Sequence, residues 1–181
     1  QQNKKNKSPQ PVQESIVVTR FTYDDLGRLA KAEKKLSHST INSGTFTGWK
    51  TIAEHSYNAL GQLQKRTLGN SIDSLIYDYN IRRWSLGLNR QFIKDNANHY
   101  FGYELGYDKA GTIIPGASFA ASQYNGNISG MVWKSKGDNE KRKYDYTYDA
   151  SNRLLNADFN QYTGGSFNKT AGMTCSFIID R

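Results

Sequence analysis

A phrase that begins with tyrosine recurs along the whole chain, and this repetition constrains the fold more than any single residue does. The first copy, residues 23–29, reads Tyr-Asp-Asp-Leu-Gly-Arg-Leu, and residues 57–63 and 148–154 follow it position for position. Looser copies begin at Tyr79, Tyr107 and Tyr124. Successive tyrosines lie between 17 and 34 residues apart. The sequence therefore predicts a repeat protein with loops of variable length.

Each copy carries residues that favour a tight turn. Asp or Asn follows the tyrosine, and its short carbonyl side chain can accept hydrogen bonds from the turn that it opens. Three residues later stands Gly27, Gly61 or Asn152, the residue types that adopt positive φ most readily. This pattern predicts a type I turn closed by a bulge, and hence a β-hairpin.

Two polar positions change together between copies. Asp24 and Arg28 flank the first turn, and Asn58 and Gln62 occupy the same positions in the second. We expect a contact across the turn, although two independent surface positions would give the same pattern. The residues expected to build the repeat turns are Tyr23, Asp24, Gly27, Arg28, Tyr57, Asn58, Gly61, Tyr107, Asp108, Gly111, Tyr148, Asp149, Asn152 and Arg153.

The segments around the turns alternate with the period of a strand. Apolar residues alternate with other residues in the stretches 101–108, 144–149 and 155–159, and again from Met173 to Ile179. No window of helical length has apolar residues at helical spacing, so helix content should be low. The sequence predicts an all-β fold of successive antiparallel β-hairpins that form a curled or spiral open sheet. Two stretches rich in Ser, Thr, Asn and Gly, residues 37–48 and 164–172, are expected to be long hairpin loops.

Length and composition limit the architecture. The 181 residues, with 36% hydrophobic residues and 23 aromatic ones, suit one domain over residues 15–181, stabilised by aromatic pairs between strands. Residues 1–14 have almost nothing to bury and predict a disordered leader. No apolar run is long enough for a membrane span. Cys175 lies on an apolar stripe, so packing is expected of it rather than reactivity.

The repeated phrases resemble the YD-repeat family, also called rearrangement-hotspot (RHS) repeats. Residues 23–29 match the family signature Tyr-Asp-x-x-Gly-Arg-Leu fully, and the stretches 77–82, 101–105 and 123–130 resemble phrases of its bacterial secreted branch. The resemblance covers about residues 15–160. It implies hairpins that join edge to edge into one sheet, which spirals into a hollow shell. It also implies a secreted or cell-surface container, often one that houses a toxin, rather than a catalyst.

The chain departs from the family in several ways. Arg83 stands where the family phrase usually has Gly, so that turn must change its type or hold the arginine in a strained conformation. The family's self-cleavage motif Asp-Pro-x-Gly is absent, so self-processing is not expected. Six repeats are too few for a closed shell. We therefore expect a slice of a shell, a remnant or a small open relative. Its end strands, near residues 16–21 and 173–179, should cover each other or pair with a second copy.

Enzymatic interpretations find little support in the sequence. His38, His55 and His99 lack the spacing of a zinc site. The pairs Asp24 with Asp25 and Asp145 with Asp149 have the residue type of glycosidase acids, but turn formation already explains the aspartates that open the turns. We expect no catalysis, no metal and no cofactor.

Binding leaves more alternatives open. The net charge of +8 would suit nucleic acid or an acidic glycan, and a speculative ligand contact is formed by Arg82, Arg83 and Trp84. The alternative is a set of solvated charges that keep a sheet soluble. The tryptophans Trp49, Trp84 and Trp133 can stack on sugars or pack against neighbouring strands.

The expected function is a non-catalytic structural repeat domain, a shell wall or a protein-interaction surface, whose partner is the rest of a larger shell or a second copy. The alternatives are a carbohydrate-binding module and, against our expectation, a nucleic-acid binder.

Overall fold

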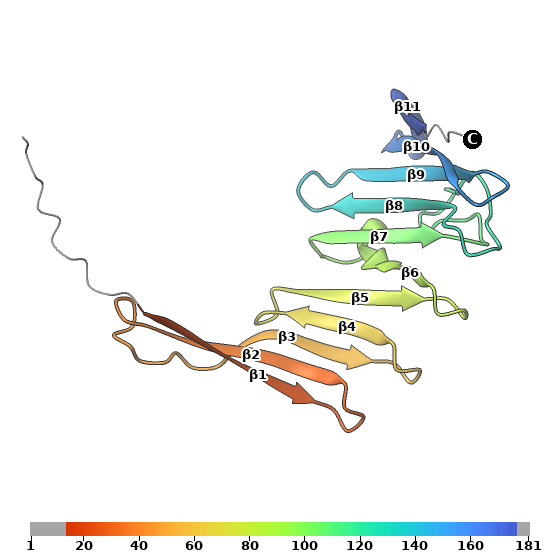
Figure 1. The fold of residues 1–181 in the computed structure, drawn as a ribbon. Helices are drawn as coiled ribbons and strands as arrows, with labels where there is room; N and C mark the ends of the chain where they lie inside the picture. Colours follow the sequence, from red (N-terminus) through yellow and green to blue (C-terminus); the bar gives the residue numbers. More distant parts are fainter. Residues whose placement is uncertain (1–13, 177–181) are drawn as a thin grey trace, which may run out of the picture. The chain divides into compact units, whose positions relative to one another are not determined.

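The computed structural model describes residues 14–176, which form an all-β fold (Figure 1). Within these residues, eleven strands lie in sequence order in one sheet, and one helix of four residues interrupts them. The neighbouring strands are antiparallel. The predicted fold class of successive antiparallel strands with low helix content is confirmed. The curl of the whole sheet stays a prediction. Residues 1–13 of the expected leader and residues 177–179 of the expected last strand lie outside the described residues.

The described part of the chain divides into two compact units, of which the first contains residues 14–56 and 67–72. Its strands are β1 (Ser15–Tyr23), β2 (Leu29–His38) and all but the last residue of β3 (Lys50–Tyr57). β1 and β2 form a long hairpin, and β3 pairs with β2 after a loop that includes most of the predicted loop 37–48. Few apolar side chains are buried in this unit, and the buried carboxylate of Glu33 pairs with Arg20 at 2.6 Å.

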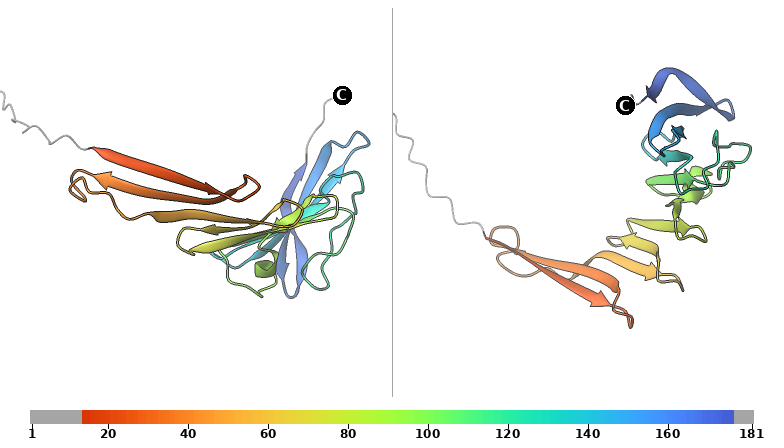
Figure 2. Two further views of the ribbon diagram at one scale, coloured as in Figure 1. Left: turned by 90° about the horizontal axis from the view of Figure 1, so that it is seen from below. Right: turned by 45° about the vertical axis from the view of Figure 1, so that its right-hand side comes forward.

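The second unit contains residues 57–66 and the chain from residue 73 onward. Its elements are the first part of β4 (Leu63–Leu68), β5 (Asp73–Tyr79), β6 (Ser85–Leu88), α1 (Arg90–Ile93), β7 (Phe101–Gly106), β8 (Gly130–Ser135), β9 (Lys141–Tyr148), β10 (Leu154–Thr163) and β11 (Ser166–Ser176). Figure 2 shows the ribbon of this unit with α1 and the long connection between β7 and β8. These two segments supply core residues to one face of the sheet, where Ile93, Ile114 and Phe119 pack with Val132 of β8.

Two glycines make this packing possible. Gly106 of β7 and Gly130 of β8 are paired, and the ring of Phe119 lies over both, so a Cβ atom at either position would overlap the ring. The connection can therefore dock closely only because these two strand residues have no side chain.

The opposite face carries an aromatic ladder. Trp133 follows Val132 in β8 and so points to the other side of the sheet. Its ring stacks on Tyr144 at 5.3 Å between centroids, and Tyr144 also contacts Tyr146 and Phe159. Such cross-strand aromatic contacts are each worth about 0.5–1.5 kcal/mol beyond area burial. The expectation that aromatic pairs join the strands is confirmed for β8, β9 and β10.

The predicted loop over residues 164–172 is wrong. Gly164 and Gly165 alone make the turn, with φ of 62° and 89°, and Thr163 pairs directly with Ser166. Two consecutive glycines with positive φ suit a two-residue hairpin turn, so the polar residues that follow belong to β11.

Candidate functional site

Four of the six sequence copies build the same turn. In the copies at Tyr23, Tyr57, Tyr79 and Tyr148, the N–H of the following Asp or Asn donates to the carbonyl oxygen four residues later, at 2.9–3.0 Å. The carbonyl oxygen of that Asp or Asn accepts a hydrogen bond from the N–H three residues later, again at 2.9–3.0 Å. Its side-chain Oδ1 accepts two further backbone N–H groups in every copy. The backbone groups and the Oδ1 atom of this residue are thus engaged by the turn itself.

The fourth residue after the tyrosine has positive φ, as the sequence predicts. The angle is 75° at Gly27, 78° at Gly61 and 61° at Asn152, so the prediction for these three positions is confirmed. Arg83 has φ 66° at the same position. Of the two alternatives for this copy, the structure has the strained arginine rather than a changed turn. The register of strand pairing also shifts beside the tyrosine, for example between Asp78 and Tyr79. This shift is the bulge that the sequence predicts.

The predicted contact across the turn is confirmed. Arg28 Nε lies 2.7 Å from Asp24 Oδ2, and Arg153 makes the same contact with Asp149 at 2.7 Å. In the second copy Asn58 Nδ2 donates to Gln62 Oε1 at 2.9 Å. The backbone N–H of Arg28 is the largest influence that lowers the pKa of Asp24, and the N–H of Arg153 does the same for Asp149.

The repeat tyrosines have a role that the sequence analysis did not foresee. The hydroxyl of Tyr79 donates to the carbonyl oxygen of Leu63 at 3.0 Å, and that of Tyr107 donates to Ser85 at 3.1 Å. Leu63 and Ser85 both lie six residues after the tyrosine of the preceding copy. Tyr148 makes a similar bond to Ile128 at 2.8 Å. In these three copies the tyrosine therefore ties the copy to the one before it, and burial raises the pKa of all three hydroxyls.

The copies at Tyr107 and Tyr124 do not form this turn. Both lie in the connection between β7 and β8, where Gly111 bridges to Ser118 and its φ is outside the left-handed region. Asn125 instead donates to the side chain of Asn152 at 2.5 Å. The prediction of a hairpin at every copy is thus wrong for these two, because Phe119 holds the connection against the sheet face.

The suggested ligand contact is only partly open. Arg82 lies over the ring of Trp84 at 5.0 Å, and Trp84 packs against Tyr107 at 5.1 Å. Arg83 is exposed, and the structure records no side-chain partner for it among the described residues. Trp49 and Trp133 are half-buried against neighbours, Trp49 under Arg20 at 4.3 Å and Trp133 in the aromatic ladder.

The histidines and aspartates considered for catalysis are dispersed. His99 Nδ1 lies 2.7 Å from Asp73, and Asp145 pairs with Lys143 at 2.7 Å, while Asp24 and Asp149 belong to their turns. Within residues 14–176, no three His, Cys, Asp or Glu side chains come together as a metal site would require. The expectation that the chain has no catalytic activity stays a prediction.

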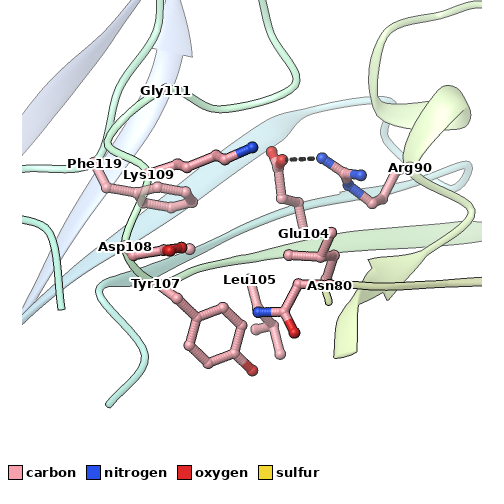
Figure 3. A pocket seen from close by; sticks show the side chains of 11 residues that line it. Asn80, Arg90, Glu104, Leu105, Tyr107, Asp108, Lys109, Gly111 and Phe119 are labelled. Carbon is pink, nitrogen blue, oxygen red and sulfur yellow. Dashed lines mark hydrogen bonds and ion pairs between the residues drawn. The ribbon is translucent and has the colours of Figure 1, made fainter. Parts of the chain in front are cut away.

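A cavity of about 220 Å³ lies beside β7 and is the candidate site (Figure 3). The turn after β5 contributes Asn80, α1 contributes Arg90, and β7 contributes Glu104. The remaining lining residues are Leu86, Leu105, Gly106, Tyr107, Asp108, Lys109, Gly111 and Phe119. Three residues of the predicted but absent turn, Tyr107, Asp108 and Gly111, therefore line a cavity instead.

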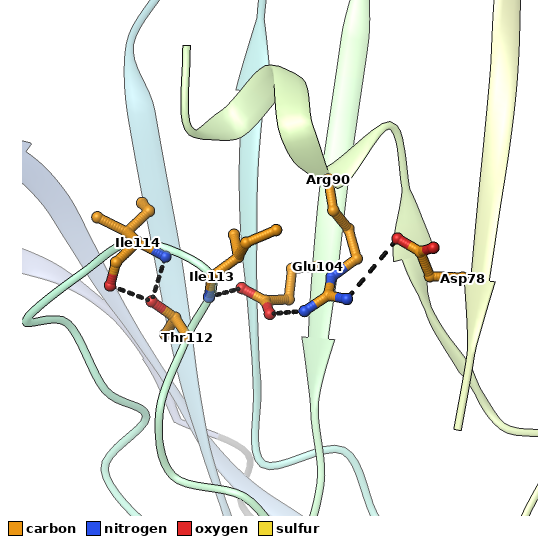
Figure 4. A network of polar contacts seen from close by, with 6 residues as sticks. All are labelled: Asp78, Arg90, Glu104, Thr112, Ile113 and Ile114. Carbon is orange, nitrogen blue, oxygen red and sulfur yellow. Dashed lines mark hydrogen bonds and ion pairs between the residues drawn. The ribbon is translucent and has the colours of Figure 1, made fainter. Parts of the chain in front are cut away.

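A buried carboxylate organises one wall of this cavity (Figure 4). Glu104 is 3% exposed; its Oε1 accepts from Arg90 Nη2 at 2.6 Å and its Oε2 accepts from the N–H of Ile113 at 2.7 Å. Arg90 also reaches Asp78 at 3.7 Å. Both oxygens of Glu104 are occupied, so this residue joins α1 and the connection to β7. In the sequence, Glu104 is recognisable only as a single charged residue between the two glycines of β7, and this pattern did not predict a buried carboxylate.

The comparisons with known proteins identify no family. No protein-family model matches the chain, and no curated protein matches it. A protein of unknown function from Bacteroides fragilis has 13% identity and a TM-score of 0.30, with 90% of this chain and 93% of that chain covered. A porin-like protein from Bacteroides uniformis has 11% identity and a TM-score of 0.27, with 89% of each chain covered. Similarity at this level carries no argument about function.

Among the residues that the structure describes, no helix combines the length and the apolar character that crossing a membrane requires.

Proposed function

We propose that the chain is a non-catalytic wall or interaction module of the YD-repeat type, in a secreted or surface-exposed protein. The observation that carries this proposal is the turn that four copies build with the same hydrogen bonds and the same left-handed residue. In these four copies the most repeated residues of the sequence serve the architecture, whereas a catalytic site depends on side chains that occur at one place.

The tyrosine ties support the same proposal. Because Tyr79, Tyr107 and Tyr148 bond to the backbone of the copy before them, these copies are stabilised by their neighbour. Stability that depends on the adjacent repeat is typical of arrays that grow by addition of like units. An array of this kind suits a wall or an extended contact surface.

The free edge of β1 indicates where such an array would continue. Among the described residues, β1 pairs with β2 alone. Val17, Phe21 and Tyr23 share one face of β1 and are 60%, 54% and 59% exposed. A strand edge that is unpaired and bears exposed apolar side chains favours pairing with another strand. We propose that its occupant is a strand of the same repeat type, supplied by a second copy of the chain.

Light scattering tests this proposal. We expect the protein to form dimers or larger assemblies as its concentration rises, and we expect the double variant Val17→Lys, Phe21→Lys to remain monomeric because lysines on an edge strand oppose pairing. Ile81→Lys, at a turn position that is 99% exposed, is the control and should assemble like the wild type. A wild-type protein that is monomeric at every concentration, or a double variant that assembles normally, would contradict the proposal.

A further inference from the structure

The cavity beside β7 has a balanced set of charges. Its charged lining residues are two carboxylates, Glu104 and Asp108, and two cations, Arg90 and Lys109, so their formal charges cancel. An anionic ligand would meet two carboxylates in this space, and a cationic ligand would meet a guanidinium and an ammonium group. A neutral ligand meets neither penalty, so the cavity suits an uncharged molecule better than an acidic glycan or a nucleic acid.

The polar groups of the cavity divide into engaged and free ones. Glu104 and Arg90 bond to each other, and the Oδ1 atom of Asn80 accepts two N–H groups of its own turn. Asp108, Lys109 and the amide nitrogen of Asn80 have no hydrogen-bond partner among the residues that the structure describes, and their side chains line the cavity (Figure 3). Among the lining residues, Asp108 therefore offers a free acceptor group, while Lys109, the Asn80 amide and the Nε atom of Arg90 are donors without a partner in the described part of the chain.

We propose that this cavity binds a neutral sugar ring through two adjacent hydroxyl groups. A hydroxyl group donates one hydrogen bond and accepts others, so two adjacent hydroxyls can donate to the two oxygens of the Asp108 carboxylate. The same hydroxyls then accept from Lys109 and from Asn80. Leu86, Leu105 and Tyr107 provide the apolar lining that the carbon-bound hydrogens of a sugar ring require. The volume of about 220 Å³ greatly exceeds the roughly 10–15 Å³ that a cavity needs, on the same measure, to hold one water molecule.

Saturation-transfer NMR with the whole chain tests the proposal. The probes are the methyl glycosides of glucose, galactose, mannose and N-acetylglucosamine, with glucuronic acid and adenosine monophosphate as anionic probes. We expect at least one neutral glycoside to bind and both anionic probes to bind more weakly. Asp108→Asn and Lys109→Gln should each weaken the binding at least tenfold, which corresponds to about 1.4 kcal/mol.

Matched variants separate this effect from a general change of charge or fold. Asp25→Asn and Lys65→Gln make the same charge changes at exposed positions that do not line the cavity, and they should leave the affinity unchanged. Thermal melting of each variant checks that it is folded. The proposal is overturned if no neutral glycoside binds, if binding survives both cavity variants, or if an anionic probe binds more tightly than every neutral one.

Discussion

At the scale of single residues, the left-handed position of the turn is the most exacting one in the repeat. Gly27 has φ 75°, and a Cβ atom built on it meets nothing within 4 Å. Replacement by valine would therefore act through the backbone alone. We expect Gly27→Val to lower the free energy of unfolding by more than about 1 kcal/mol, because a β-branched residue is strained at positive φ. Urea denaturation measures this loss, and an unchanged midpoint would contradict the assignment of strain to the turn.

Arg83 offers the converse experiment at the same position of another copy. Its φ of 66° is strained for arginine, and its side chain has no recorded partner among the described residues. We expect Arg83→Gly to raise the free energy of unfolding by up to about 1 kcal/mol, since the strain disappears while the unfolded chain gains some entropy. Arg82→Gly, next to it and with no positive φ, should not stabilise the protein. Equal effects of the two variants would show that strain at residue 83 is not the cause.

The tyrosine ties give a third prediction at this scale. Tyr107 is 8% exposed and its hydroxyl bonds to the carbonyl oxygen of Ser85. Tyr107→Phe leaves that carbonyl without its donor, and we expect a loss of about 1 kcal/mol in the free energy of unfolding. Tyr124→Phe is the control, because Tyr124 is 72% exposed and no side-chain hydrogen bond is recorded for it in the described part of the chain. Urea denaturation of both variants distinguishes the tie from a general effect of removing a hydroxyl.

At the scale of elements, the turns were predictable and the long connection was not. The information for a turn lies within five consecutive residues, such as Asp24 and Gly27, so the sequence predicts its bulge and its positive φ. The connection between β7 and β8 depends on Phe119 docking over Gly106 and Gly130, which are distant in the sequence. This docking also decides which face is buried: the side of β7 with Gly102, Glu104 and Gly106 is covered, and the side with its aromatic residues is more exposed. The apolar pattern alone predicts that the aromatic side of β7 is the buried one. The cavity beside β7 could not be predicted from the sequence for the same reason, because it forms where the connection docks.

A buried acid–base pair joins two elements and makes their attachment depend on pH. Asp73 at the start of β5 accepts from His99 at 2.7 Å and from the N–H of Tyr100 at 3.1 Å, just before β7. Burial acts to raise the pKa of Asp73, but the hydrogen bonds from His99 and from the backbone outweigh it, and the pKa lies below its usual value of 3.8. A lowered carboxylate pKa stabilises the fold above the unfolded-state value, and this stabilisation is lost as pH falls through the lower, folded-state value.

We therefore expect the wild type to lose more stability than Asp73→Asn between about pH 5 and about pH 2. Other carboxylates with lowered pKa, such as Asp24 and Asp149, titrate in both proteins, so the difference between the two curves isolates Asp73. Urea unfolding at a series of pH values gives both curves. Parallel curves would mean that the pair with His99 contributes no pH-dependent stability.

At the scale of the whole molecule, the net charge of +8 already subtracts every carboxylate, so the cations that are free of carboxylate partners decide whether a polyanion can bind. Many of the cations in the described residues already pair with carboxylates. These are Arg20, Arg28, Lys31, Arg90, Lys134, Lys141, Arg142, Lys143, Arg153 and Lys169. A paired lysine or arginine must give up its carboxylate before it can neutralise a phosphate. These ten cations are therefore less available to a polyanion, and their mixture with carboxylates is typical of a surface that keeps a sheet soluble.

Salt dependence tests this argument. We expect any association with duplex DNA or single-stranded RNA to be weak and to vanish by about 0.15 M salt, because the paired cations are held by carboxylates and do not displace counterions. Fluorescence anisotropy of labelled oligonucleotides over a salt series measures the slope. The sequence suggests Arg82 and Arg83 as the residues that would contact phosphates. The double variant Arg82→Gln, Arg83→Gln is therefore compared with the wild type over the same salt series. Binding that persists at about 0.2 M salt, with a slope that falls by about two in this variant, would establish a phosphate-binding site at the turn and overturn the argument from ion pairing.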